Sequence, residues 1–324
     1  MKQVRIGGQA VLEGIMMKGP ASYSLAVRKP DGEIAVEVTS YRSFSERKKL
    51  NRIPILRGII NFIESLYIGI KTLMASSEYF EDEEEEGEKD QKKKKKEKED
   101  SARNSGSGKE EKSNKGYMIG TLIFSLIFAI GIFVLLPSFL AGLLLKVTDQ
   151  QWISNLVEGI LRLAIFIGYV ALISKLEDIR RTFMYHGAEH KAINCLEAGD
   201  DLTPENVLKH TRFHKRCGTS FVFIVMIISI IVFMFVQTEI MWLRLLSRIL
   251  LIPVIAGLSY EVLQYAGRHE NACSRIMSAP GLWVQRLTTK EPDRSMAEVA
   301  IWAVEQVIDV SEYLECVRNN SFEK

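Results

Sequence analysis

Two histidines and a glutamate lie close together in the stretch MYHGAEHKAINC, residues 184–195. His186 and His190 are four positions apart, and Glu189 directly precedes the second histidine. On a helix, this spacing places both imidazoles on one face, about one turn apart. Imidazole is a common metal ligand, and a neighbouring carboxylate can act as a general base. The stretch therefore predicts two metal ligands, His186 and His190, with Glu189 as the catalytic residue.

A second cluster follows in KHTRFHKRC, residues 209–217. His210, His214 and Cys217 stand at positions i, i+4 and i+7, so they share one face if this segment is a helix. Imidazole and thiolate are the ligands that zinc prefers, and zinc usually takes four ligands. We therefore expect a divalent metal, zinc for preference, with ligands from both clusters.

The residues alone leave three interpretations of these clusters open. The histidines could simply form hydrogen bonds among the arginines of a polar segment. Two residues from each cluster could instead close a structural zinc site. A metal site with chemistry is favoured by Glu189, because the order H-x-x-E-H is shared with the inverted zinc-peptidase motif. In that arrangement the glutamate deprotonates water whose pKa the ion has already lowered.

Three further residues are candidates for the same site. Glu261 and His269 lie at one end of the last apolar segment, and an acid at the foot of a transmembrane helix is a functional candidate. A salt bridge from Glu261 to Arg180 or Arg181 is the alternative. Glu13 lies in GGQAVLEGIMMKGP, residues 7–20, whose glycines permit close approach of a ligand to the backbone. This segment lacks the ending of a phosphate-binding loop, and we expect its glycines to serve turns of a β element.

Four apolar segments follow the N-terminal third of the chain. Two of them, 116–145 and 219–237, carry no charged residue. The other two, 156–174 and 245–265, hold charged residues only towards their ends. A helix needs roughly 20 apolar residues to cross a bilayer. The sequence therefore predicts a multi-pass membrane protein.

Basic residues are unevenly distributed between these segments. The chain before residue 116 and the connection 175–218 are rich in Lys and Arg, whereas the other connections carry few. The positive-inside rule then places both termini and the 175–218 loop in the cytoplasm. The four cysteines show no framework spacing, which fits a reducing compartment. We expect a protein of the cytoplasmic membrane with its histidine clusters at the cytosolic face.

The polar segments have patterns of their own. Residues 22–41 alternate around a Pro-Asp-Gly turn, which predicts two strands. Residues 280–293 are expected to form a loop, and Ser295 is expected to cap a C-terminal helix. The expected organisation is an N-terminal cytosolic β element (1–50), an amphipathic interfacial helix (51–77), a disordered charged linker (78–116), a transmembrane core (117–278) with the metal-site loop (175–218), and a C-terminal cytosolic helix (279–324).

Together these elements define a fold class and a set of partners. We expect an α-helical multi-pass membrane protein with about four transmembrane helices, a small N-terminal β element and a C-terminal soluble amphipathic helix. The lysine run at 91–99 is interpreted as a solvated spacer near anionic lipid, so no nucleic-acid partner is expected. The expected partners are the lipid bilayer and a cytosolic or membrane protein.

Several motifs together resemble the YqhQ-like family of bacterial membrane proteins. The matching stretches are GGQAVLEGIMMKGP (7–20), YHGAEHKAINCLEAG (185–199), ENVLKHTRFHKRCGTSF (205–221) and PGLWVQRLTTKEPD (280–293). It is a domain-of-unknown-function family whose members are described as predicted metal-dependent enzymes. The resemblance implies a multi-pass membrane protein with a metal site and no named substrate. By position, the implied ligands are His186, His190, His210, His214 and Cys217, with Glu189 beside them.

Two functions follow from these observations. The leading hypothesis is a membrane-bound, zinc-type metalloenzyme, a hydrolase that acts at the cytosolic membrane face with Glu189 as its general base. The alternative is a non-enzymatic, metal-stapled scaffold or assembly factor that binds a protein partner. Metal transport is less favoured, because transporters place polar residues near the midplane of the membrane and two of the apolar segments carry no charge.

Overall fold

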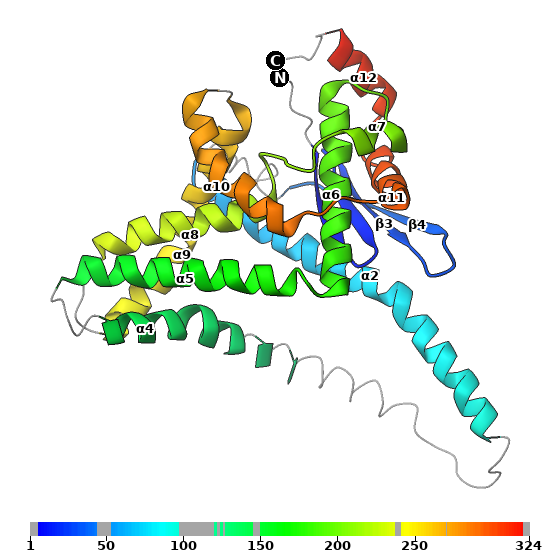
Figure 1. Cartoon of the computed structure of the whole chain (residues 1–324). Coiled ribbons are helices and arrows are strands. Elements are labelled where there is room, and N and C mark those ends of the chain that lie inside the picture. Colours follow the sequence, from blue (N-terminus) through cyan, green and yellow to red (C-terminus); the bar gives the residue numbers. More distant parts are fainter. Residues whose placement is uncertain are drawn as a thin grey trace. The chain divides into compact units, whose positions relative to one another are not determined.

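The fold is available as a computed structural model, which describes residues 6–43, 53–96, 120–121, 124–125, 127–144, 150–236, 241–269 and 271–319. The chain divides into two compact units. The first comprises Met1–Phe80 and Val170–Lys324, and the second comprises Glu81–Tyr169. Figure 1 shows the elements in chain order.

The first unit contains a four-stranded antiparallel sheet in the order β1-β2-β3-β4. Its strands are β1 (Gly7–Val11), β2 (Gly14–Lys18), β3 (Ser22–Arg28) and β4 (Ile34–Ser40). Strands β3 and β4 confirm the expected hairpin, and its turn contains Gly32 at a φ of 90°. Gly7, Gly8 and Gly14 lie in strands β1 and β2 and not in turns as expected, whereas Gly19 lies in the turn between β2 and β3. Residue 14 of β2 must be glycine, because an added Cβ there would stand 2.4 Å from the carbonyl oxygen of Ala26 on β3.

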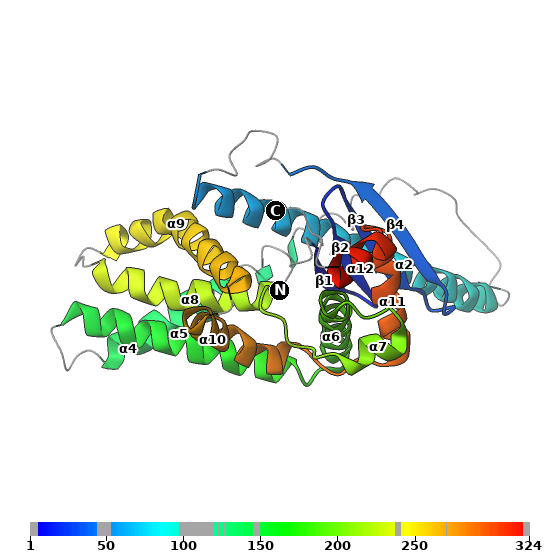
Figure 2. The ribbon, with the colours of Figure 1, turned by 90° about the horizontal axis from the view of Figure 1, so that it is seen from above.

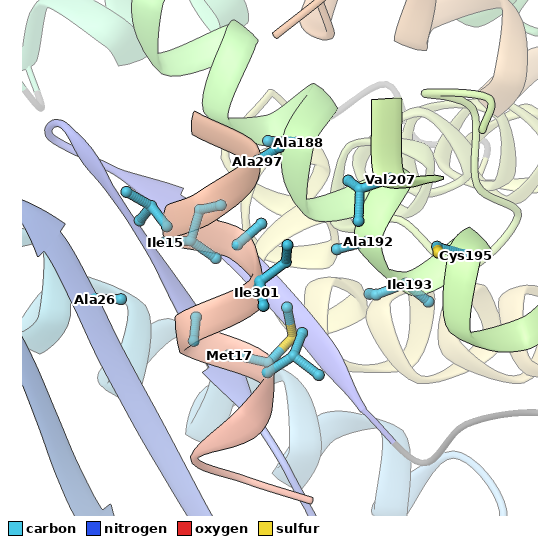
Figure 3. Packing of buried hydrophobic residues seen from close by; sticks show 14 of the residues in the cluster. Ile15, Met17, Ala26, Ala188, Ala192, Ile193, Cys195, Val207, Ala297 and Ile301 are labelled. Carbon is cyan, nitrogen blue, oxygen red and sulfur yellow. The ribbon is translucent and has the colours of Figure 1, made fainter. Parts of the chain in front are cut away.

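Two helices cover one face of this sheet. Helix α6 (Glu177–Ala198) packs on β1 and β2, and α11 (Arg294–Glu305) packs on β2, β3 and β4. The core between them is built of small and branched side chains, among them Ile15, Ala188 and Ala297, all with no exposed area. Figure 3 shows this packing. Because alanines line both helices, their backbones approach the sheet closely, and α6 is held rigidly beside β1.

The opposite face of the sheet packs on α2 (Leu56–Lys96). Ile68 of α2 is buried in a second cluster with Val11 and Leu25. Ser76 of α2 accepts a hydrogen bond from the backbone N–H of Leu12 at 3.3 Å. The start of α2 is tied to α9 (Met241–Arg268) by the ion pair of Arg57 with Glu261. The sheet therefore lies between α2 on one side and α6 with α11 on the other.

The remaining helices of this unit are α7 (Pro204–Lys209), α8 (Gly218–Phe235), α10 (Ala272–Thr288) and α12 (Val310–Arg318). Helices α8, α9 and α10 pack against one another. Helix α10 includes most of 280–293, so the expected loop is wrong there; Asn271 caps the helix and Pro280 is accommodated inside it. The expected cap of α11 is also wrong, because Asp293 rather than Ser295 accepts the hydrogen bond from Met296 N–H.

Within the described residues, four helices are long and apolar enough to cross a membrane: Leu56–Phe80, Trp152–Ile173, Gly218–Phe235 and Leu246–Arg268. The expected number is confirmed, but the set differs. Leu56–Phe80 covers most of the helix expected at the interface, and its exposed apolar side chains suit lipid. The expected span 116–145 lies partly outside the described residues, and a shorter apolar helix, Ile127–Ala141, occupies part of it. Residues 78–96 of the expected linker form the end of α2, and its remaining residues, 97–116, lie outside the described residues.

The second unit holds η2 (Gly131–Leu135), α4 (Leu136–Leu144) and most of α5 (Gln151–Ile173). Arg162 of α5 pairs with Glu158 one turn away at 2.8 Å and donates to the carbonyl of Phe133 at 3.0 Å. Ser138 of α4 donates to the same carboxylate at 2.8 Å. The two charges that the sequence places in this apolar segment are thus paired, as charges in a membrane must be.

Candidate metal centre

Helix α6 carries both histidines of the first cluster on one face. The helix begins with Glu177 and Asp178, whose charges favour its N-terminus, and it ends at Gly199, which has a φ of 83°. The rings of His186 and His190 lie one turn apart, with centroids separated by 4.4 Å. His190 is almost fully buried, at 1% exposure. The expected helical placement of this pair is therefore found.

Cys217 completes a group of three with these histidines. The Sγ atom of Cys217 lies 3.1 Å from Nε2 of His186. One ligand atom from each of His186, His190 and Cys217 lies within 4.8 Å of the other two, and the group could hold a metal ion. Cys217 occupies the N-cap of α8, where its sulfur also accepts a hydrogen bond from Thr219 N–H at 3.4 Å. The start of an apolar helix thus delivers a sulfur to the histidine face of α6.

Backbone carbonyls orient both imidazoles. Nδ1 of His186 lies 2.8 Å from the carbonyl oxygen of Thr288, and Nδ1 of His190 lies 2.6 Å from that of Arg212. A carbonyl oxygen can only accept, so each Nδ1 must carry the proton and donate it. Each Nε2 is then left with its lone pair when the ring is neutral. Metal-binding histidines are typically held in this way by a second hydrogen bond.

The segment after α10 supports these carbonyls. Lys290 N–H donates to the carbonyl of Phe183 on α6 at 2.8 Å. Gly187 allows this contact, because an added Cβ would lie only 2.0 Å from the carbonyl oxygen of Lys290. Arg212 donates in turn to the carbonyl of Thr289. The glycine of the H-G-A-E-H stretch therefore serves the close packing that positions both histidine anchors.

Charge on His186 and Cys217 is coupled. Burial lowers the pKa of His186. Cys217, Glu189 and the hydrogen bond to the Thr288 carbonyl together outweigh burial and raise this pKa to about 9. Burial raises the pKa of Cys217, yet His186 and His190 hold it well below its usual range. The sulfur is thus favoured as thiolate, which is the form that binds metals. Two nitrogens and a thiolate sulfur fit zinc better than magnesium or calcium, which prefer oxygen.

Glu189 lies beside the group without belonging to it. Its side chain is buried, and Oε2 stands 3.6 Å from Nε2 of His190. The side chain of Glu189 packs directly on the backbone of Gly8 in β1, since a Cβ added at Gly8 would stand 2.6 Å from Cγ of Glu189. The carboxylate is therefore held between α6 and β1.

A cavity of about 750 Å³ opens at this place. His186, Glu189, His190 and Cys217 all line it. Its other walls come from β1 and β2, from α2 and from α9. Because α2 and α9 contain candidate membrane spans, the cavity lies where the sheet meets apolar helices. The candidate metal-binding group of His186, His190 and Cys217 is thus open to a ligand larger than water.

The second histidine cluster is not helical. Helix α7 ends at Lys209 and α8 begins at Gly218, so the expected common helix face is wrong. His214 still approaches the group: its ring centroid is 5.7 Å from that of His190, and its Nε2 is 3.5 Å from Oε2 of Glu197. His210 lies apart and pairs with Asp200 at 2.9 Å. The buried Lys191 donates to the carbonyls of Leu208 and His210, so acceptors at the end of α7 are satisfied by a side chain where the helix stops.

The other three candidates have different surroundings. The carboxylate of Glu13 forms an ion pair with Arg181 and accepts from the Tyr185 hydroxyl at 3.3 Å. The carboxylate of Glu261 is paired with Arg57, and not with Arg180 or Arg181 as the alternative interpretation expected. The ring of His269 stacks on Tyr265, with centroids 4.3 Å apart. These three side chains are not among those that line the cavity.

Sequence reasoning missed the parts that surround the ligands. The Gly-Gly-Gln-Ala stretch of β1 lines the cavity, and Thr288 and Arg212 orient the imidazoles through their carbonyls. Backbone carbonyls leave no mark on residue type, so no motif could reveal these anchors. The glycine pair at residues 7 and 8 is a signal, because adjacent glycines in a strand indicate close approach of another group.

Comparison with known proteins identifies a family that the chain matches. The family described as "Protein of unknown function (DUF1385)" matches residues 53–310. The chain is also 36% identical over 310 residues to the "Uncharacterized protein YqhQ" of Bacillus subtilis (strain 168), which covers 93% of this chain and 92% of that protein. No solved structure matches the chain.

Proposed function

We propose that this chain, which belongs to the DUF1385 family, is a membrane-bound metal-dependent hydrolase that holds its ion through His186, His190 and Cys217. One observation carries the proposal. Both imidazoles donate from Nδ1 to backbone carbonyls, which leaves their Nε2 atoms facing a buried sulfur, and binding of an ion would release the proton between His186 and Cys217. Histidines that merely satisfied hydrogen bonds on a polar face would have no reason to gather three ligand atoms.

The donor set and the cavity support hydrolysis over storage of an ion. Zinc is the divalent metal that this set of two nitrogens and one thiolate favours. When bound, such an ion polarises a carbonyl and makes water more acidic. Three protein ligands are typical of catalytic sites, which keep one position open for substrate or water. Here the group lines a cavity rather than a closed core.

Glu189 is the general base in this proposal. Its Oε2 lies close to the ligand atom of His190 and faces the same cavity. A carboxylate at this place accepts the proton of an attacking water and passes it to the leaving group. Burial between α6 and Gly8 of β1 restricts its movement, which keeps the base aligned with the reacting atoms.

The membrane setting belongs to the same proposal. The basic residues around α6 and α7 support a cytosolic position for the site, with both termini on that side of the cytoplasmic membrane. The bilayer would then be the first partner, in contact with the exposed apolar side chains of the candidate spans. A protein partner on the cytosolic side stays part of the proposal, and no nucleic acid is included.

Two variants test the proposed roles. Glu189→Gln should keep the metal and lose hydrolysis of p-nitrophenyl acetate, because only the proton acceptor is removed. His190→Ala should lose both metal and activity, because a ligand and its anchored ring are removed together. Metal content is measured on detergent-purified protein by mass spectrometry. Wild-type activity in Glu189→Gln, with metal present, would overturn the role of Glu189.

A structural zinc site in a scaffold or assembly protein is the second candidate. It is favoured by His214, whose ring lies 5.7 Å from that of His190 and could supply a fourth ligand. Four protein ligands and no water would mark such a closed site. X-ray absorption of the zinc-loaded protein distinguishes the two: a third imidazole nitrogen, as the fourth ligand, that disappears in His214→Ala supports the scaffold, and a water oxygen supports the hydrolase.

A further inference from the structure

Strand β1 has a free edge. It is the first strand of the sheet, and within the described residues it pairs with β2 alone. Val11 and Gly14 flank a two-residue turn and form a hydrogen-bonded pair, and such pairs alternate along an antiparallel ladder. Gly8 and Ala10 therefore direct their N–H and C=O groups away from β2. Leu12, next in this alternation, bonds outward to Ser76, as the register requires.

This free edge borders the cavity of the candidate metal centre. Gly7, Gly8, Gln9 and Ala10 all line the cavity, together with the metal-binding group. Figure 2 shows β1 as the strand nearest to α8 and α9, which carry the opposite wall. Gly8 lies against Glu189, so the outward backbone groups of β1 stand next to the proposed base.

The edge also lacks the usual protection against strand addition. Natural edge strands are commonly blocked by proline, by a charged side chain or by a bulge. The stretch Gly-Gly-Gln-Ala contains neither a proline nor a charge, and its pairing with β2 is regular. Donors and acceptors that stay unused among the described residues, at alternate positions of β1, match the backbone of an extended peptide, which is how peptides bind by strand addition. A lipid chain offers no such partner groups.

We infer that the substrate of this site is an extended polypeptide segment, which adds as a further strand to the free edge of β1 and presents a peptide bond to Glu189. The inference rests on the proposed hydrolase function and names its substrate class. In the reaction, water oxygen bonds to the carbonyl carbon and the C–N bond breaks. Glu189 takes a proton from the water and delivers it to the leaving nitrogen, so that a carboxylic acid and an amine result.

Proline substitution tests the edge directly. Ala10→Pro removes an outward N–H without removing a hydrogen bond to β2. Val38→Pro in β4 is the matched control. The register of β3 and β4 also directs the backbone N–H of Val38 away from its neighbouring strand, at the opposite edge of the sheet. The probe is a library of internally quenched decapeptides with randomised sequence, added to zinc-loaded protein in detergent. We expect Ala10→Pro to lower cleavage about tenfold, the effect of one lost hydrogen bond, and Val38→Pro to cleave like wild type.

Altered peptides provide a second test that leaves the protein unchanged. Strand addition uses the N–H groups of alternate peptide residues. Methylation of the backbone nitrogen in the best-cleaved peptide should therefore block binding at every second position beside the cleaved bond and be tolerated between them. Binding is measured by fluorescence anisotropy on zinc-loaded Glu189→Gln protein. Equal tolerance at all positions would overturn strand addition, even if Ala10→Pro fails to fold.

The outcomes separate this inference from the proposed function. If p-nitrophenyl acetate is hydrolysed with dependence on Glu189 but no decapeptide is bound or cleaved, the polypeptide substrate is wrong and the hydrolase stands. Turnover of phospholipid vesicles in place of peptides would assign the cavity to a lipid and equally overturn the inference. If hydrolysis of both probes ignores Glu189, the proposed function itself fails.

Discussion

A single methyl group at Gly8 should separate catalysis from metal binding. An added Cβ at Gly8 would stand 2.6 Å from Cγ and 2.8 Å from Oε1 of Glu189. Carbon atoms in ordinary contact lie about 3.5–4.0 Å apart. Glu189 must therefore move by roughly 1 Å in Gly8→Ala, and a displacement of this size can cost about 100-fold in rate. The three atoms nearest to this Cβ all belong to Glu189, and none belongs to His186, His190 or Cys217.

The assay combines activity with metal content. Hydrolysis of p-nitrophenyl acetate should fall by about two orders of magnitude in Gly8→Ala, while the zinc content stays at the wild-type level. Gly7→Ala is the matched control, since its added Cβ meets nothing within 4 Å. It should behave like wild type in both measurements. Full activity in Gly8→Ala would refute the placement of Glu189 between α6 and β1. A loss of zinc from Gly8→Ala, while Gly7→Ala keeps its zinc, would refute it as well.

Further predictions concern the supports of the site. Gly187→Ala should push the carbonyl of Lys290 away and weaken zinc binding about 10–100-fold, measured by chelator competition; an unchanged affinity would contradict the anchoring role of that segment. Removal of zinc should lower the melting temperature, because an ion at about 1,000 times its Kd stabilises the folded state by roughly 4 kcal/mol; recovery on adding zinc is the check. Asp293→Ala should cost about 1 kcal/mol of unfolding free energy through loss of the α11 cap. Burial raises the pKa of Asp293, but hydrogen bonds from Ser295 and Met296 outweigh burial and lower it. The stabilisation by this cap is therefore present above the ordinary pKa of Asp and is lost as pH falls through the lowered pKa of Asp293. Equal acid sensitivity of the variant and the wild type would refute this prediction.

Much of the architecture could be predicted from local patterns. The alternation and turn at 22–41 specified β3 and β4, and the four-residue spacing specified the histidine face of α6. The resemblance to the YqhQ-like family is confirmed by the comparison with its Bacillus subtilis relative. The number of apolar spans also agreed, although Leu56–Phe80 is one of them. Each of these signals lies within a short window of sequence.

The failures share a different cause. Strands β1 and β2 are rich in glycine because Gly8 and Gly14 meet neighbouring elements at close range, and the pattern therefore suggested turns. Cys217 reaches the histidines because the segment between α7 and α8 is not helical, and not because it shares a helix face with His210 and His214. Pro280 suggested a loop inside α10, where neighbouring helices accommodate it. Tertiary contacts decide all three, and no local pattern records them.

Metal analysis is the most direct test of the central claim. Wild-type protein is purified in detergent beside the double variant His186→Ala/His190→Ala and the control His210→Ala, whose histidine pairs with Asp200 outside the metal-binding group. Wild type and the control should each retain a single equivalent of zinc, and the double variant should retain none. Equal zinc content in all three proteins would contradict a metal centre at His186, His190 and Cys217.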